Sequence, residues 1–291
     1  MAQEKGIAFL PLSAAPYSLL EKYGLAGGGK GIFLEVPPNF KLEKEIKLNL
    51  NNQSQNLILL KKDASARLYL EGGLEASKLE SYSEKTIIIA EEGAKMDFSA
   101  FILFETSAKA SINRHFLISD LAKITCMQGS FGGKDVNVST ECSINKGAEL
   151  SLNQLSAASP GSTYSEKTMG VICKEGGRFY FESRNVVFST SKSFCTVNAK
   201  IKEEASGSDM AIRAKVLKEG HDCYAEVKPI LEVYNNQVVA AHGAVVKEIE
   251  KEELFYLQSR GIPLQKAKKI LLNGFISEVI GVHKEILYKV F

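Results

Sequence analysis

Hydrophobic and polar residues alternate in short segments from Lys30 to about Val233. Typical segments are 32–36, 57–60, 67–70 and 86–89, and Gly, Asn, Asp or Ser residues separate them. Alternation with a period of two is typical of β-strands that bury one face, and amphipathic helical spacing is almost absent over this stretch. The pattern therefore predicts an all-β core, to which we assign residues 30–248.

A short unit recurs within this region, consisting of a corner of small residues followed by an alternating strand. Three such units begin at Gly93, Ser107 and Leu121, 14 residues apart, and segments 147–152 and 176–181 repeat the pattern at less regular spacing. Repetition of one such unit favours a stacked β-solenoid, in which each coil buries its apolar face against the next. A β-sandwich with similar strand spacing is the alternative that the pattern alone leaves open.

The two ends of the chain have helical patterns. In the lead-in, residues 1–29, Pro16 suits a first helical turn, and an apolar face follows it over 17–23. In residues 249–291, acidic residues precede an apolar run at 254–257, and helical spacing continues over 264–279. A third helix is predicted over 283–290. We expect this C-terminal helical segment to act as a cap over the last apolar coil, which a solenoid needs.

Composition and charge restrict the class of protein. Of the 291 residues, 45% are hydrophobic, and 36 Lys and Arg residues face 34 Asp and Glu residues, a net charge of +2. This balance gives no reason to expect binding to nucleic acid. No apolar run approaches the roughly 18 residues of a membrane helix, and the first residues do not resemble a signal peptide. We therefore expect a cytoplasmic protein without a membrane partner.

Motifs for intrinsic catalysis are missing. Residues 24–31 nearly match the phosphate-binding loop, but Gly31 stands where that motif has a hydroxyl, and a strand pattern follows where the motif needs a helix. The five cysteines form no Cys-x-x-Cys pair, which argues against a disulfide framework or a zinc site. His-Glu-x-x-His and Gly-x-Ser-x-Gly do not occur, and the acids are scattered rather than clustered as in polysaccharide-cleaving solenoids. The sequence predicts a protein that is not an enzyme.

Five segments near the C-terminal end carry a family resemblance. They are Pro229-Ile-Leu-Glu-Val233, Val238-Val-Ala-Ala-His242-Gly-Ala-Val245, Glu252-Glu-Leu-Phe-Tyr-Leu257, Ser259-Arg-Gly-Ile262 and Gly274-Phe-Ile-Ser-Glu-Val279. In this order and at this spacing they resemble the SufB/SufD family of iron–sulfur cluster assembly proteins. Gly243, directly after His242, resembles SufD more closely than SufB.

The resemblance implies a right-handed parallel β-helix ended by helices, and it favours the solenoid over the sandwich. It implies a non-catalytic subunit of a SUF-type assembly complex that works with a SufC-type ATPase. The ATPase would dock on the C-terminal helices, and a SufB-type subunit or a second copy of this chain would bind the β-helix. The docking residues implied are Leu254, Phe255, Tyr256, Arg260 and Ile262.

His242 matches the histidine of the family motif and is the candidate residue for cluster assembly. Two departures stand beside it: Ala240 replaces the motif cysteine and Val245 replaces a threonine. The resemblance implies no intrinsic cofactor, only a transient iron–sulfur cluster shared with a partner. One alternative is a homodimeric scaffold that itself carries the nascent cluster. Another is an unrelated β-helical protein that acts on polysaccharides.

Overall fold

The chain forms two parallel sheets that face each other. The computed structural model describes residues 8–26, 30–50, 53–72, 81–220, 222–280 and 283. The nine-stranded sheet contains, in spatial order, β1 (Ala8–Pro11), β2 (Ile32–Val36), β4 (Gln53–Leu60), β6 (Ser81–Ala90), β8 (Lys109–Ile118), β10 (Asp135–Ile144), β12 (Thr163–Ile172), β14 (Lys192–Ile201) and β16 (Tyr224–Val233). The eight-stranded sheet contains β17 (Val239–Glu248), β15 (Asp209–Glu219), β13 (Arg178–Phe188), β11 (Glu149–Ala158), β9 (Lys123–Gly132), β7 (Lys95–Phe104), β5 (Ser65–Gly72) and β3 (Lys41–Leu50).

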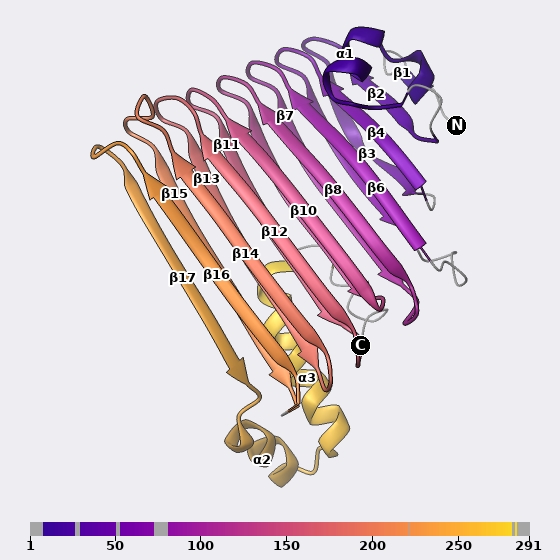
Figure 1. The fold of residues 1–291 in the computed structure, drawn as a ribbon, viewed down its shortest axis with the longest axis vertical. Coiled ribbons are helices and arrows are strands. Elements are labelled where there is room, and N and C mark those ends of the chain that lie inside the picture. Colours follow the sequence, from indigo (N-terminus) through magenta and orange to yellow (C-terminus); the bar gives the residue numbers. More distant parts are fainter. Residues whose placement is uncertain are drawn as a thin grey trace.

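From β2 to β17, successive strands alternate between the two sheets, and each sheet pairs its strands in parallel. Among the strands of the described residues, only β1, which lies antiparallel to β2, departs from this pattern. The chain therefore winds as a coil, one strand of each sheet per turn, as Figure 1 shows. This arrangement confirms the predicted parallel β-helix, because the strands of a β-sandwich would be antiparallel.

The corners between the sheets explain the recurring small residues. Gly93 and Gly147 adopt positive φ angles of 69° and 60°, and the alanines that follow them, Ala94 and Ala148, are fully buried. A left-handed residue turns the chain sharply, and only a small side chain fits inside the bend. Leu121 occupies the same position with φ of 60° although it carries a Cβ atom, so this corner is strained.

Inward-facing side chains stack in rows along the coil axis. One row follows the register of the eight-stranded sheet through Phe98, Cys126, Leu152, Phe181 and Ile212, all of them buried. Similar rows from the other sheet complete a continuous apolar core. Each coil therefore covers the apolar face of its neighbour, as the sequence pattern predicts.

A line of polar side chains crosses this interior. The guanidinium of Arg114 donates to both carboxylate oxygens of Glu84 at 2.8 and 2.9 Å, and to Gln128 Oε1 at 3.0 Å. Gln128 in turn donates to Thr140 and Gln154 at 2.9 and 2.8 Å. These side chains are almost inaccessible to solvent. The hydrogen bonds join strands of successive coils, so they fix the coils in register as well as compensating for burial.

The lead-in covers part of one outer face. After the short helix η1 (Leu12–Ala14), helix α1 (Tyr17–Lys22) begins directly after Pro16, as predicted. Leu12 and Leu20 pack on outward-facing residues of the nine-stranded sheet, including Phe33 and Leu57. Gly31, the last residue of the segment that nearly matches the phosphate-binding loop, is needed for packing. A Cβ atom at this position would lie 1.8 Å from a backbone oxygen of β4.

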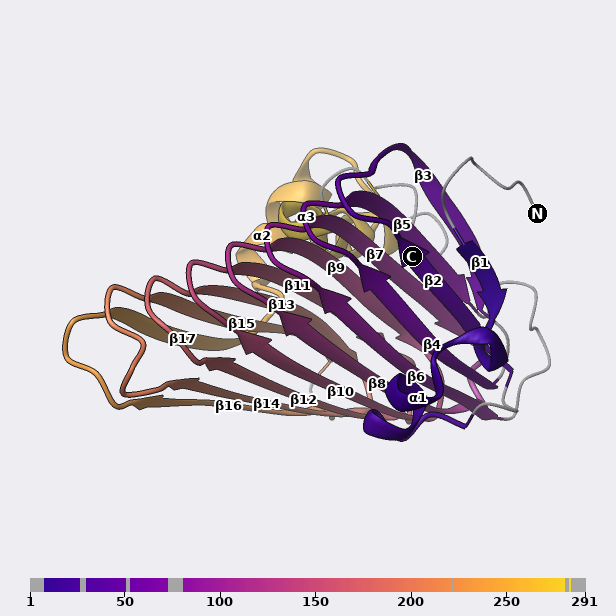
Figure 2. The same cartoon turned by 90° about the horizontal axis from the view of Figure 1, so that it is seen from above.

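The C-terminal helices are α2 (Lys251–Ser259) and α3 (Leu264–Ile280). They lie on the outer face of the eight-stranded sheet, opposite the side that carries α1 (Figure 2). The apolar side of α3 packs on outward-facing apolar residues of that sheet, namely Tyr69, Phe101, Met127, Leu155, Val186 and Leu217. The two helices are present as predicted. They do not cover the last coil as a cap, because the apolar residues that α3 contacts lie on the outer face of the eight-stranded sheet.

The predicted helix over 283–290 lies outside the described residues, except for His283. The ring of His283 packs against Tyr69 and Phe101, with ring centres 5.3 and 5.2 Å apart, and its Nε2 atom lies 2.8 Å from Ser99 Oγ. Among the described residues, no helix is both long and apolar enough to cross a membrane.

Candidate functional site

The end of the coil at β16 and β17 is open. These strands are the last of their sheets, and among the described residues neither has a strand on its outer side. Large apolar side chains are exposed here, namely Tyr224, Ile230, Val233, Tyr234, Val239, Val245 and Val246. Unpaired backbone groups beside an exposed apolar surface form a template for pairing with another chain.

His242 lies in the middle of this open end. The register of β17 pairs it with Ile212, so it continues the inward-facing row of buried residues described above. In the described part of the chain no further coil follows β17, and His242 is exposed. The row thus ends in an imidazole that any partner bound to this end of the coil would contact.

The residues beside His242 leave space around it. A Cβ atom placed on Gly243 would have no neighbour within 4 Å, so the chain alone does not require glycine there. Ala240 faces the same way as His242, pairs with Met210 and packs against the end of the core. Room for another backbone is therefore present at Gly243, and the thiol of the family motif is missing at Ala240.

The described residues contain no group of three or more His, Cys, Asp or Glu side chains placed to hold a metal ion. Cys126, Cys142, Cys195 and Cys223 are buried, and Cys173 is only partly exposed. Burial raises the pKa of Cys126 to about 12, although Arg114 opposes this. Since the thiolate is the form that binds metal, the interior thiols are poorly suited to hold a cluster.

Helix α2 presents a second apolar surface. The exposed fractions of Phe255 and Tyr256 are 73% and 59%, and α2 buries none of its side chains. The guanidinium of Arg260, at the end of the helix, lies 5.5 Å from the ring centre of Tyr256. Leu254 and Ile262 are half-buried beside them. The five predicted docking residues thus lie within nine consecutive positions, 254–262, in α2 and in the turn that follows it.

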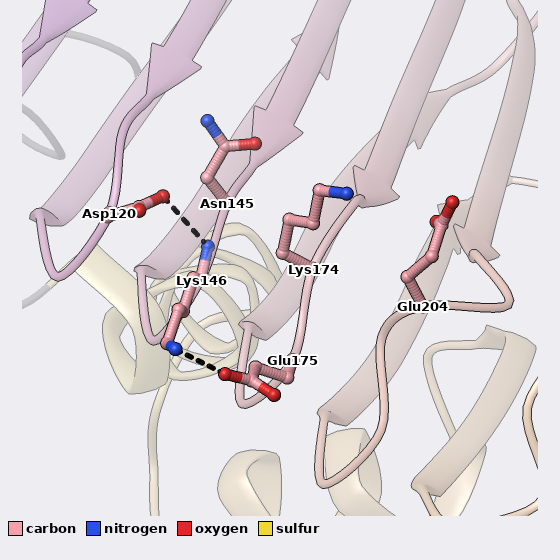
Figure 3. A pocket seen from close by; sticks show the side chains of 6 residues that line it. All are labelled: Asp120, Asn145, Lys146, Lys174, Glu175 and Glu204. Carbon is pink, nitrogen blue, oxygen red and sulfur yellow. Dashed lines mark hydrogen bonds and ion pairs between the residues drawn. The ribbon is translucent and has the colours of Figure 1, made fainter.

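The corners of neighbouring coils form a charged hollow of about 380 Å³, drawn in Figure 3. Its charged groups partly compensate each other: Lys146 forms an ion pair with Glu175, and the backbone N–H of Lys146 donates to Asp120. Similar pairs link earlier corners, such as Lys61 with Glu91 at 3.2 Å. We interpret this hollow as a set of ties between coils rather than as a binding site.

Sequence reasoning missed the buried charged residues. Glu84 and Arg114 both occupy inward-facing positions of the neighbouring strands β6 and β8. They are 30 residues apart in sequence, close to the 28 residues that separate register partners of these strands, such as Thr86 and Arg114. That spacing was the available signal. Arg184, which holds α3 to the sheet, gave no such signal, because its partner Glu278 is 94 residues away in the chain.

Comparison with known proteins agrees with this structure. Residues 45–275 match the family model of the SufBD core domain of the SUF system for iron–sulfur cluster assembly. The chain is 22% identical to the iron–sulfur cluster assembly protein SufD of Bacillus subtilis, over 98% of this chain and 73% of that protein. It is 24% identical to a SufBD family protein of Staphylococcus saprophyticus and 23% identical to one of Staphylococcus aureus, and spans 59% and 55% of their lengths. The family match covers most of the two sheets and the helices beside them, and on this ground the chain belongs to the SufBD family of iron–sulfur cluster assembly proteins.

Proposed function

We propose that this chain is a non-catalytic subunit of a SUF-type assembly complex in the cytoplasm. It binds a SufC-type ATPase through α2 and a second β-helical subunit through its open end. The observation that carries the proposal is the pair of uncovered surfaces: one at β16 and β17, where both sheets stop, and one on α2.

The second subunit is a SufB-type chain or another copy of this one. Strand β17 offers unpaired backbone groups along its outer edge, and added strands of a partner would satisfy them. The exposed valines Val239, Val245 and Val246 would lose contact with water at the same time. Both effects favour a partner that continues the coil.

The iron–sulfur cluster is the cargo of such a complex. A neutral imidazole is a known ligand of iron, and in some clusters it replaces thiolate. His242 would therefore contribute one ligand at the junction of the two subunits. One imidazole cannot hold a cluster alone, so the other ligands come from the second subunit.

The ATPase would supply the ATP chemistry that this sequence does not support. Phe255 would insert into an apolar pocket of the ATPase, and Arg260 would pair with a carboxylate beside that pocket. Exposed aromatic and arginine side chains of this kind commonly carry most of the binding energy of an interface.

The first test is co-purification with a SufC-type ATPase. We expect Phe255→Ala to weaken binding by about thirtyfold, corresponding to about 2 kcal/mol, and Arg260→Ala to weaken it less. Tyr17→Ala is the matched control, because Tyr17 is an aromatic residue that is 77% exposed on the lead-in. Equal binding by all three variants would place the ATPase elsewhere.

The second test concerns His242. We expect His242→Ala to lower the cluster yield of the reconstituted complex without changing its assembly, and His115→Ala, a partly exposed histidine of β8, to have no effect. A cluster on the anaerobically purified chain alone would instead favour the homodimeric scaffold. Polysaccharide-cleaving activity would contradict both functions.

A further inference from the structure

Arg184 is a buried charge beneath helix α3. It lies on the outward face of β13, and only 4% of its surface is exposed. Its register neighbour Leu155 belongs to the apolar patch that α3 covers. A guanidinium in such surroundings costs free energy unless its donors are satisfied.

The contacts of Arg184 join the sheet to the helix. Its Nη2 atom donates to Glu182 at 2.7 Å and to Glu278 of α3 at 2.6 Å. Its Nη1 atom donates to the backbone oxygen of Phe275 at 3.3 Å, and the Cζ atom of the guanidinium lies 5.1 Å from the centre of the Phe275 ring. One side chain thus engages both an acid and an aromatic residue of the same helical turn.

Apolar contact alone would not fix α3 in one position, because hydrophobic attraction has no direction. The planar fork of arginine does have a direction. Glu278 is the one acid in the sequence of α3, so a slip of the helix by one turn, about 5.4 Å, would take away the only carboxylate that α3 offers to Arg184 and leave it with Glu182 of its own strand. The Arg184–Glu278 pair therefore selects one register of α3 on the sheet.

This arrangement gives a structural role to the segment Gly274-Phe-Ile-Ser-Glu-Val279. Phe275 and Glu278 are three residues apart, so they lie on one face of the helix, and both contact Arg184. A second ion pair, between Lys268 and Glu219 at the end of β15, ties the beginning of α3 to the same sheet. Lys215 and Lys247, which also act on Glu278, are further positive charges near this end of the helix.

We propose that Arg184 is a positioning residue that anchors α3 in one register on the eight-stranded sheet and thereby sets the place of α2. The inference rests on the proposed function only in its last step, that α2 is the docking surface for the ATPase. A partner bound to α2 is then connected through α3 and Arg184 to the sheet that ends at His242.

The test combines amide hydrogen exchange of the full chain with ATPase binding. We expect Glu278→Gln and Arg184→Met to speed exchange of the α3 amides by roughly tenfold or more, the loss of a charged hydrogen bond. Arg184→Lys keeps the charge without the fork and should have a smaller effect. The double variant Arg184→Met/Glu278→Gln should be no faster than Arg184→Met alone. Lys269→Gln, at an exposed position of α3, is the matched control.

The two readouts separate the possible failures. Glu278 is largely exposed, so Glu278→Gln should fold even where Arg184→Met does not. Exchange equal to wild type in Glu278→Gln and Arg184→Lys would overturn the anchoring role. Faster exchange with unchanged ATPase affinity would overturn the positioning role. An ATPase that fails to bind the wild-type chain would overturn the proposed function instead, while the exchange rates would still decide whether Arg184 anchors α3.

Discussion

The interior pair of Glu84 and Arg114 provides the most demanding test of the fold. Replacing Arg114 with Met keeps most of the side-chain length and removes the charge. Glu84, whose exposed fraction is zero, would then be a carboxylate without its cation, and Gln128 would lose a donor. We expect Arg114→Met to destabilise the chain strongly.

The magnitude follows from the three hydrogen bonds that the guanidinium makes, all at 3.0 Å or less. Breaking a buried ion pair by removing one partner costs about 3–5 kcal/mol. Total stabilities are usually about 5–15 kcal/mol, so one substitution would remove a large share. Burial by itself lowers the pKa of Arg114, but the carboxylate of Glu84 raises it above its usual value, so the arginine stays charged at any pH of the assay.

Urea unfolding followed by circular dichroism of the strands measures the effect. The double variant Glu84→Gln/Arg114→Met removes both charges and should be more stable than Arg114→Met alone. Arg67→Met is the matched control, because Arg67 forms an exposed ion pair with Asp97 at 3.4 Å, and it should barely move the urea midpoint. A loss below about 1 kcal/mol in Arg114→Met, or a double variant less stable than the single one, would refute the reasoning.

Three further predictions concern separate features. Burial raises the pKa of Glu166 above its usual value, so the stability that its protonated form contributes is complete below the unfolded-state pKa and is lost as the pH rises through the folded-state pKa; Glu166→Gln should remove this fall in the urea midpoint as the pH rises above the usual pKa of glutamate. Leu121→Gly relieves a positive φ angle at a side chain that is 57% exposed, so it should raise the free energy of unfolding by about 0.5 kcal/mol in the same assay, and a lower free energy of unfolding would contradict the strain at this corner. Val246→Lys places a charge on the inward-facing side of β17 at the open end, where Val246 is 44% exposed; it should abolish association with the second subunit in sedimentation experiments, and unchanged association would exclude this end as the interface.

The sequence predicts local elements well and their packing less well. Alternation and the small corners before Lys95, Lys109 and Lys123 identified strands that the structure contains at those positions. The position of α3 was not predictable in this way. Its apolar side matches outward-facing residues such as Phe101 and Leu155, which come from separate coils, and only the folded coil brings them together.

The same distinction between local sequence and packing applies to the candidate site. The motif around His242 was visible because its residues are adjacent in the chain. That His242 continues a row of core residues and is exposed only because the coil stops there depends on the register with Ile212. The exposure of Phe255 is likewise a consequence of packing. The apolar residues of α2 could equally belong to a buried helix, but none of the side chains of α2 is buried in the structure.

Ala240 allows a direct test of how this chain contributes to cluster assembly. Residues two apart on a strand share one face, about 6.5 Å from each other, so Ala240→Cys would place a thiol beside His242 on the inward-facing side of β17. If the supply of ligands at the open end limits assembly, Ala240→Cys should raise the iron bound per reconstituted complex, and it should do so only while His242 is present. Ala241→Cys is the matched control, because alternation places its thiol on the opposite face of the same strand. Equal iron content in the two variants would mean that the second subunit already supplies the thiolates, and that an imidazole is all this chain needs to provide.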